Sequence, residues 1–259
     1  MTVSLIYFSA TGTTKKIVEA ISEGIAVDNA PVSVDITSRA DIPATKFWEN
    51  DMVIFGVPVY AGRVPAIAAS RLVHFRGNNT PAIIVTTYGN REFDDALVEL
   101  CDLVTAGGFD VISGGAFIAR HSIFPDVAAA RPDADDLKTA AELGRKSAAI
   151  VSSSARILAK LPTIKGNRPY REPGKAMFHP KAGRKCNGCG ICAEMCPVGA
   201  IDKADIKKCD TALCISCARC IYVCPRKARN FGGLTYRLAG RKFAGLYSAP
   251  KYPYVFYRE

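Results

Sequence analysis

Short apolar runs alternate with amphipathic stretches along the first 150 residues of the chain. In residues 14–26, Ile17, Ile21 and Ile25 recur at every fourth position, which places one apolar stripe along an α-helix. The whole pattern predicts strands over 3–8, 32–36, 52–57, 82–87 and 111–118, and helices over 14–26, 66–76, 93–106 and 133–160.

The alternation of strands and helices indicates a parallel sheet, because each helix serves as the crossover between two strands. Five such strands predict a doubly wound α/β domain over residues 1–160. In a sheet of this kind the loops that follow the strands meet at one edge, where ligands bind.

The alternation stops near residue 160. Residues 161–185 are rich in proline, glycine and basic side chains, which predicts an extended linker. Cysteines dominate the next segment, 186–230, and predict a second, small domain. Residues 231–259 form a basic C-terminal extension that is too aromatic for a plain disordered tail.

The sequence also lacks several signals. No run of about 20 apolar residues is present, so no membrane span is expected. Residues 1–8 resemble a strand and lack the basic region and cleavage site of a secretory signal. We therefore expect a cytoplasmic protein, in which ten cysteines favour metal binding over disulfides.

Eight of the ten cysteines form two copies of one spacing, CxxCxxCxxxCP. The first three thiolates of a copy surround one [4Fe–4S] cubane, whereas the fourth belongs to the other cluster in two-cluster proteins. The spacing therefore predicts two clusters. Cluster I takes Cys186, Cys189, Cys192 and Cys224, and cluster II takes Cys214, Cys217, Cys220 and Cys196.

Two structural zinc sites are the alternative, since paired CxxC motifs also bind zinc. The repeated four-cysteine run with its proline favours iron–sulfur clusters instead. Cys101 and Cys209 lie outside the motifs and are expected as small buried residues. Cys209 also remains a candidate for a spare ligand or a redox-sensitive thiol, because it lies only five residues before Cys214.

A hydroxyl-rich loop separates the first predicted strand from the first predicted helix. A phosphate suits this position, because a helix N-terminus offers free N–H groups and the positive end of a dipole. Gly12 lets the backbone approach a phosphate closely. The candidate phosphate ligands are Ser9, Thr11, Gly12, Thr13 and Thr14. The alternative is a hydroxyl-rich helix cap without a ligand.

Two later loops follow the third and fourth predicted strands and would lie beside the first at the same sheet edge. Together the three loops resemble a flavodoxin-type FMN site, in which a T-G-x-T loop holds the phosphate and two loops embrace the isoalloxazine. Tyr60 and Tyr88 are the aromatic candidates for ring contact. The full set from these two loops is Pro58, Val59, Tyr60, Ala61, Gly62, Thr87, Tyr88, Gly89 and Asn90.

The combination of motifs resembles one family up to about residue 230. "YGNREFDDAL" at 88–97, "GNRPY" at 166–170 and the two cluster motifs are similar to flavodoxin–ferredoxin fusion proteins of the EFR type. The resemblance implies a flavodoxin-like FMN domain over 1–160 and a small α+β bacterial 2[4Fe–4S] ferredoxin domain over 186–230. The extension 231–259 lies outside it.

Charge divides the chain unevenly. Residues 1–150 carry 18 acidic and 13 basic side chains, whereas residues 151–259 carry 6 and 21. The excess of positive charge lies in the two segments that flank the neutral cysteine module. We expect these basic arms to clamp the negatively charged cofactor domains together, within one chain or across a homodimer.

The cofactors imply a redox function, because cubanes carry single electrons and flavins carry one or two. We expect an electron-transfer protein that converts between two-electron and one-electron carriers, with an unidentified protein or small molecule as donor and acceptor. A flavin-dependent reductase of a small substrate is the alternative. A nucleic-acid-binding regulator is a further alternative that the basic arms suggest and that no known reader fold supports.

Overall fold

The N-terminal part of the chain is a parallel sheet covered on both faces by helices. The computed structural model describes residues 1–26, 29–37, 41–153, 160–174 and 176–259. Five strands run parallel in the order β7-β6-β4-β1-β2, as expected for a flavodoxin-like sheet. They are β1 (Thr2–Tyr7), β2 (Val32–Asp35), β4 (Asp51–Pro58), β6 (Thr80–Tyr88) and β7 (Phe109–Ile118).

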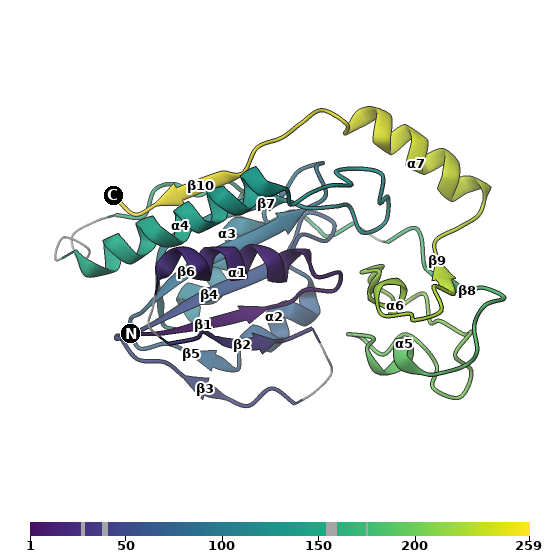
Figure 1. The fold of residues 1–259 in the computed structure, drawn as a ribbon, viewed down its shortest axis with the longest axis horizontal. Helices are drawn as coiled ribbons and strands as arrows, with labels where there is room; N and C mark the ends of the chain where they lie inside the picture. Colours follow the sequence, from purple (N-terminus) through teal and green to yellow (C-terminus); the bar gives the residue numbers. More distant parts are fainter. Residues whose placement is uncertain (27–28, 38–40, 154–159, 175) are drawn as a thin grey trace.

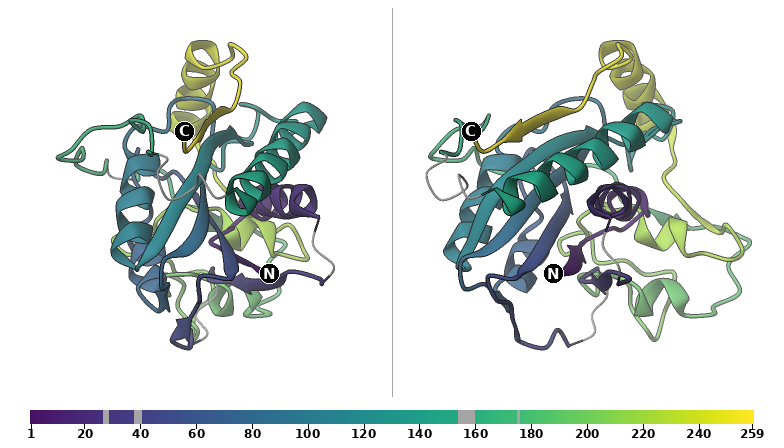
Figure 2. Two further views of the ribbon diagram at one scale, coloured as in Figure 1. Left: turned by 90° about the vertical axis from the view of Figure 1, so that its left-hand side faces the viewer. Right: turned by 60° about the vertical axis from the view of Figure 1, so that its left-hand side comes forward.

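Helices α1 (Thr13–Ile25) and α4 (Ala134–Ser152) cover one face of the sheet, and α2 (Ala66–Leu72) and α3 (Ala96–Ala106) cover the other (Figures 1 and 2). Glycine allows the close contact of α1 with α4, because a Cβ on Gly144 would lie 1.9 Å from the carbonyl oxygen of Ile21. The helix predicted over 133–160 is confirmed to residue 152, and residues 154–159 lie outside the described residues.

The C-terminal extension is part of the first domain, which the sequence analysis did not predict. Helix α7 (Leu234–Leu246) leads to strand β10 (Tyr254–Tyr257), which pairs antiparallel with β7 and makes a sixth strand (Figure 1). Phe256 is buried in the core and Arg258 forms an ion pair with Asp110. The physical reason is that β7 would otherwise leave an unpaired edge, whose backbone groups β10 satisfies.

The cysteine module is small and has little regular structure. Short helices α5 (Ile191–Glu194) and α6 (Arg219–Tyr222) occupy equivalent places in the two cysteine repeats, and β8 (Lys181–Ala182) pairs with β9 (Arg229–Asn230). A second two-stranded pair, β3 (Thr45–Lys46) with β5 (Phe75–Arg76), lies beside the large sheet. In the part of the chain that the structure describes, no helix is long and apolar enough to cross a membrane.

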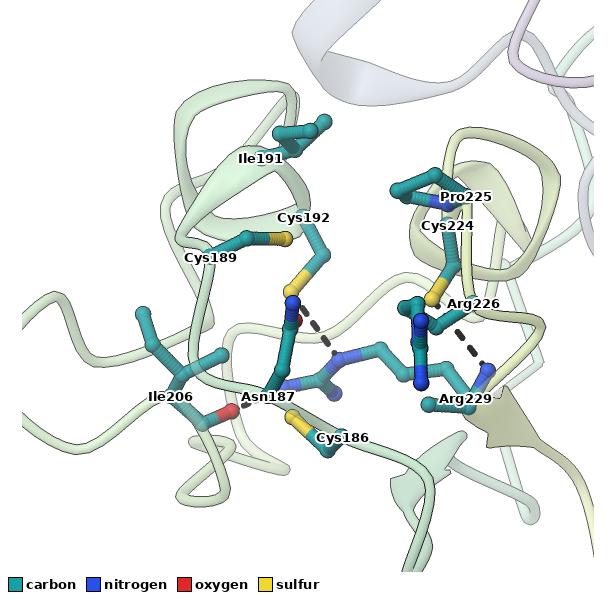
Figure 3. Close-up of a pocket in the computed structure, with 11 residues that line it drawn as sticks. Cys186, Asn187, Cys189, Ile191, Cys192, Ile206, Cys224, Pro225, Arg226 and Arg229 are labelled. Carbon is teal, nitrogen blue, oxygen red and sulfur yellow. Dashed lines mark hydrogen bonds between the residues drawn. The ribbon is translucent and has the colours of Figure 1, made fainter.

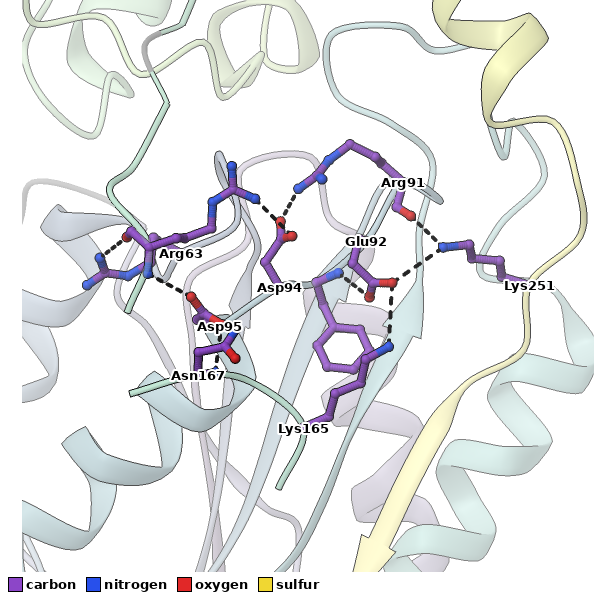
Figure 4. A network of polar contacts seen from close by, with 10 residues as sticks. Arg63, Arg91, Glu92, Asp94, Asp95, Lys165, Asn167 and Lys251 are labelled. Atoms are coloured by element: carbon purple, nitrogen blue, oxygen red, sulfur yellow. Dashed lines mark hydrogen bonds and ion pairs between the residues drawn. The ribbon is translucent and has the colours of Figure 1, made fainter. Parts of the chain in front are cut away.

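The linker is held on α3 by a polar network (Figure 4). The carboxylate of Asp95 accepts hydrogen bonds from the backbone N–H groups of Asn167 and Arg171, at 2.8 and 2.7 Å. Burial opposes ionisation of Asp95, but these bonds outweigh it and lower the pKa of its carboxyl group. Arg168 adds a two-pronged ion pair with Asp102. The basic linker therefore does contact acidic groups of the first domain.

Candidate functional site

The eight motif cysteines line two separate cavities. The fourth cysteine of each repeat lines the cavity of the other repeat. Cavity I is lined by Cys186, Cys189, Cys192 and Cys224 (Figure 3), and cavity II is lined by Cys196, Cys214, Cys217 and Cys220. The two cavities are of similar size. Within the described residues, no group of three His, Cys, Asp or Glu side chains is placed for a single metal ion.

The two repeats place their thiols with the same backbone geometry. Gly190 and Ala218 adopt left-handed conformations directly before α5 and α6, with φ of 81° and 61°. The N–H groups of Ala200 and Ala228 donate to the sulfurs of Cys196 and Cys224, at 3.3 and 3.2 Å. Small residues are needed at these positions, because they free backbone N–H groups to approach sulfur.

Burial disfavours the thiolate forms of two cysteines of cavity II. It raises the pKa of Cys217 and that of Cys220 to about 12. A bound metal cluster requires thiolates, so cluster insertion must release these two protons.

Arg229 is a buried cation beside cavity I that the sequence analysis did not single out. It is 2% exposed, and its Nε donates to the sulfur of Cys192 at 3.2 Å (Figure 3). Its Nη2 donates to the carbonyl of Ile206, and its Nη1 is buried with no hydrogen-bond partner among the described residues. A comparison of the two cysteine repeats could have indicated this residue, since "CPRKAR" has Arg229 at the position where "CPVGAI" has Ile201.

The two remaining cysteines have different surroundings. Cys101 is buried in α3, as expected. Cys209 is half-buried and lines cavity II together with the four motif cysteines. Burial first, and then the neighbouring Cys214, raise the pKa of Cys209 to about 11. The structure therefore places a fifth thiol at cavity II.

The hydroxyl-rich loop forms the start of α1. Gly12 precedes the helix with a φ of 84°, a left-handed conformation that favours glycine. The hydroxyl oxygen of Ser9 accepts from the N–H of Lys15 at 3.0 Å, and the Thr14 hydroxyl is 2.7 Å from that of Thr87. Ser9 and Thr14 thus brace the loop, whereas Thr11 and Thr13 are half-buried at its surface.

The other two candidate loops follow β4 and β6, at the same edge of the sheet as the first loop. In the loop 58–62, Tyr60 and Arg63 exchange backbone hydrogen bonds around Ala61 and Gly62, which have φ of 53° and 84°. The Tyr60 ring packs edge-on against Phe8, with 6.4 Å between ring centroids. Pro58 is buried at the end of β4, and Val59 is half-buried after it.

Two side chains of the loop 87–90 contact other segments of the chain. Tyr88 is 5% exposed and packs against Phe93, 5.6 Å between centroids. The Asn90 amide donates to the carbonyls of Tyr247 and Ala249, at 2.6 and 3.0 Å. Asn90, which the sequence analysis assigned to the flavin ring, thus holds the segment between α7 and β10.

The cysteine module lies against the hydroxyl-rich loop on the side of cavity II. Nη1 of Arg219 donates to the carbonyl oxygens of Ser9 and Ala10, at 3.4 and 3.3 Å. A Cβ placed on Gly12 would lie 3.0 Å from the hydroxyl oxygen of Tyr222. Cys217 is buried in the same apolar cluster that Tyr60 packs against. Nothing in the local sequence indicates these contacts, because they join segments about 200 residues apart.

The fold and the paired cysteine cavities define a class of protein: an electron-transfer protein that joins a flavodoxin-like domain to a dicluster ferredoxin domain. Family comparisons agree. A flavodoxin domain matches residues 4–80, and a 4Fe–4S dicluster domain matches residues 185–228. The chain is a flavodoxin–ferredoxin fusion.

Solved structures of similar proteins include an archaeal flavodoxin, which is 18% identical with a TM-score of 0.40 over 59% of this chain and 100% of its own. Oxidised flavodoxin 2 from Bacillus cereus is 13% identical with a TM-score of 0.43, over 57% of this chain and 98% of its own. The rubredoxin oxygen:oxidoreductase from Desulfovibrio gigas is 15% identical with a TM-score of 0.43, over 58% and 36%. No curated protein sequence matches significantly.

Matched cysteine variants test the exchange of ligands between the repeats. Because Cys196 lines cavity II, Cys196→Ala should remove cluster II and leave cluster I, although Cys196 belongs to the first repeat. Cys224→Ala should do the opposite. Iron content and the EPR signals of the reduced protein measure both. Loss of the cluster of its own repeat in either variant would contradict the exchange.

The burial and hydrogen bonds of His121 predict that the folded protein loses stability in mild acid. Its Nδ1 accepts from the N–H groups of Ile123 and Phe124, both at 3.1 Å, which requires a neutral ring. Burial first, and then the charge of Arg91, lower the pKa of His121 from 6.5 to about 4. The unfolded chain therefore binds a proton below pH 6.5 that the folded protein binds only near pH 4.

The expected result is a fall in the free energy of unfolding of roughly 2 kcal/mol between pH 7 and pH 5, measured by urea titration. His121→Phe should lose this dependence, whereas His74→Gln, which changes an exposed histidine, should keep it. A wild-type stability that is constant over this range would show that His121 protonates without cost.

Proposed function

We propose that this protein passes electrons between FMN in its N-terminal domain and two [4Fe–4S] clusters in its ferredoxin domain, and so converts between two-electron and one-electron carriers. The observation that carries the proposal is the position of cavity II against the hydroxyl-rich loop. Arg219 and Tyr222, from the helix beside cavity II, reach Ser9, Ala10 and Gly12.

The contacts support a linear order of centres within one chain. The candidate FMN loops adjoin cavity II through Tyr60 and Cys217. Cavity II in turn adjoins cavity I, since Arg229 bonds the sulfur of Cys192 and its charge also acts on Cys220. Electrons between the flavin and cluster I would therefore pass through cluster II.

The residues at the sheet edge fit FMN by their donor set. Thr11 and Thr13 offer hydroxyl groups at the start of α1, where free N–H groups favour a phosphate. Ala61, Gly62 and Asn90 in the second and third loops have left-handed backbone conformations, which turn these loops tightly at the sheet edge. When bound, FMN supplies the two-electron chemistry that the clusters lack.

The eight thiols fit the clusters, because each cavity is ringed by four cysteines in the order that the spacing requires. Backbone N–H groups and Arg229 donate to these sulfurs and thereby tune the potentials. In cavity II, Cys196 and Cys217 are buried.

Anaerobic rapid mixing tests the proposal. The protein with both cofactors is mixed with a one-electron reductant, and flavin and cluster absorbance are followed separately. Reduction of clusters and flavin should be kinetically linked in the wild type. In Cys220→Ala, which removes a ligand of cluster II, FMN should still bind and its reduction should slow sharply.

Independent reduction of the two cofactors in the wild type would overturn the proposal. The same experiment separates the shuttle from the reductase. Saturable reoxidation of the flavin by a small molecule would favour a reductase, whereas exchange with protein carriers alone supports electron transfer.

A further inference from the structure

The basic residues of the two arms differ in their partners. Lys165, Arg168, Arg171, Lys251 and Arg258 form ion pairs with carboxylates of the N-terminal domain. Others, including three on α7, are exposed and form no ion pair within the described part of the chain. Five of these flank the cysteine module; they are Lys181, Arg184, Lys185, Arg226 and Lys227, here called the basic port.

Backbone pairing brings the basic port together from two parts of the sequence. Strand β8, which begins at Lys181, pairs with β9, and the N–H of Gly183 donates to the carbonyl of Ala228 at 2.7 Å. The N–H of Cys186 donates to the carbonyl of Gly183. This turn places Arg184 and Lys185 beside residues 226–228. Residues 176–190 and 224–233 contain no Asp or Glu, so no acid within these segments offsets the charge.

The basic port lies beside cavity I, whose cysteines include an exposed one. Arg226 lines cavity I, and Cys186 directly follows Lys185. Cys189 is exposed, whereas none of the four motif cysteines of cavity II is. A Cβ added to Gly188 or Gly190 would meet nothing within 4 Å, so the loop that covers cavity I faces open space. Cavity II faces the flavodoxin-like domain instead.

We infer that the basic port is the docking surface for an acidic one-electron carrier protein, which exchanges electrons with cluster I. The inference rests on the proposed function. In each encounter one electron would leave the reduced carrier and enter cluster I, a transfer that needs no proton. Two encounters would supply the two electrons for full reduction of a flavin, which would also take up one or two protons from water. The reverse transfers would return the electrons and release those protons.

Charge placement favours a protein carrier over nucleic acid. Uncompensated charges around the exposed edge of a redox centre accelerate the encounter with an oppositely charged partner. Single-stranded nucleic acids require exposed aromatic rings for stacking as well. Tyr236 and Phe243 of the extension are engaged instead, since Tyr236 stacks on Phe124 at 5.6 Å and Phe243 packs on His121 at 4.7 Å.

Two charge-reversal variants of the full chain with its cofactors test the inference. The port variant is Arg184→Glu, Lys185→Glu, Lys227→Glu, which leaves out Arg226 because it lines cavity I. The matched control is Arg237→Glu, Arg241→Glu, Lys242→Glu, which makes the same change of charge on exposed positions of α7. The probe is a reduced acidic plant-type [2Fe–2S] ferredoxin, mixed anaerobically with each protein by stopped flow.

The port variant should react at least about tenfold more slowly than the wild type at low salt, and the difference should shrink as salt screens the charges. The control should change by less than about threefold. Equal slowing of both variants would overturn the inference, because only the net charge would then matter. Milder Gln substitutions at the port, with iron content measured, separate lost docking from lost folding.

Two further readouts keep the alternatives apart. Flavin–cluster exchange within each variant, driven by a small neutral mediator, should match the wild type. If the wild type shows no flavin–cluster exchange, the proposed function is contradicted. If exchange persists and the port variant reacts with ferredoxin as fast as the wild type, only the docking role of the basic port is contradicted. Salt-dependent retention of a DNA duplex, lost in the port variant while ferredoxin rates stay unchanged, would assign the surface to nucleic acid.

Discussion

Replacement of Arg229 by leucine is expected to lower the reduction potential of cluster I strongly and that of cluster II less, because the charge of Arg229 also acts on Cys220. Each cluster gains a negative charge when it is reduced, and a buried cation nearby stabilises that charge. The two repeats do not share Arg229, because Ile201 holds its place in the first repeat.

The size of the effect follows from the burial of Arg229. It is 2% exposed, with Nε 3.2 Å from the Cys192 sulfur, so water screens it poorly. A unit charge roughly 5 Å from the added electron contributes on the order of 3 kcal/mol at an effective dielectric constant of about 20. That energy corresponds to on the order of 100 mV for a one-electron couple.

An EPR-monitored redox titration of the reconstituted protein measures the two clusters separately. Arg226→Leu is the matched control, because Arg226 lines the same cavity but is exposed and therefore screened. Arg229→Lys keeps the positive charge but alters the hydrogen bond to the Cys192 sulfur. This variant therefore separates the contribution of the charge from that of the hydrogen bond. Equal shifts of both clusters, or an unshifted cluster I with full iron content, would rule out this role for Arg229.

Replacement of Phe256 by alanine is expected to destabilise the flavodoxin-like domain by about 3–5 kcal/mol, although this residue lies in the C-terminal extension, beyond the cysteine module in the sequence. Phe256 is 5% exposed within the core, and β10 pairs its backbone with Ser113–Ala116 of β7. The ring of Tyr254 stacks on Phe93, which adds to the coupling of the strand with the core.

Urea unfolding, followed by circular dichroism and by release of flavin fluorescence, measures this effect. The control Tyr252→Ala removes a ring that is 83% exposed and should change stability by less than about 0.5 kcal/mol. Removal of residues 252–259 should exceed the single substitution and expose the edge of β7 to aggregation. A flavodoxin-like domain of unchanged stability after this truncation would show that β10 only covers the sheet.

Sequence patterns of short range predicted much of the protein. The parallel order of the five main strands followed from alternation, because a helix between two strands requires a crossover. The grouping of the eight cysteines followed from spacing, because the reach of the chain around a cubane is local. The hydroxyl-rich loop was located in the same way, by its place between one strand and one helix.

Features that join distant segments were not predictable. Asn90 bonds to carbonyls more than 150 residues away, so its amide is engaged by the C-terminal segment. The basic arms were expected to act as one clamp, but only some of their charges found carboxylate partners. The partner of a side chain depends on which segments pack together, and a sequence pattern carries no information on that.

The sequence by itself therefore determined the two kinds of domain and their candidate cofactor ligands, since periodicity and spacing are local constraints on the chain. Tertiary structure alone decided that β10 completes the sheet, that cavity II lies against the candidate flavin loops, and that Arg229 is buried beside one cluster cavity. These depend on the burial of apolar surface and of unpaired polar groups between segments far apart in sequence, and that burial exists only in the folded protein.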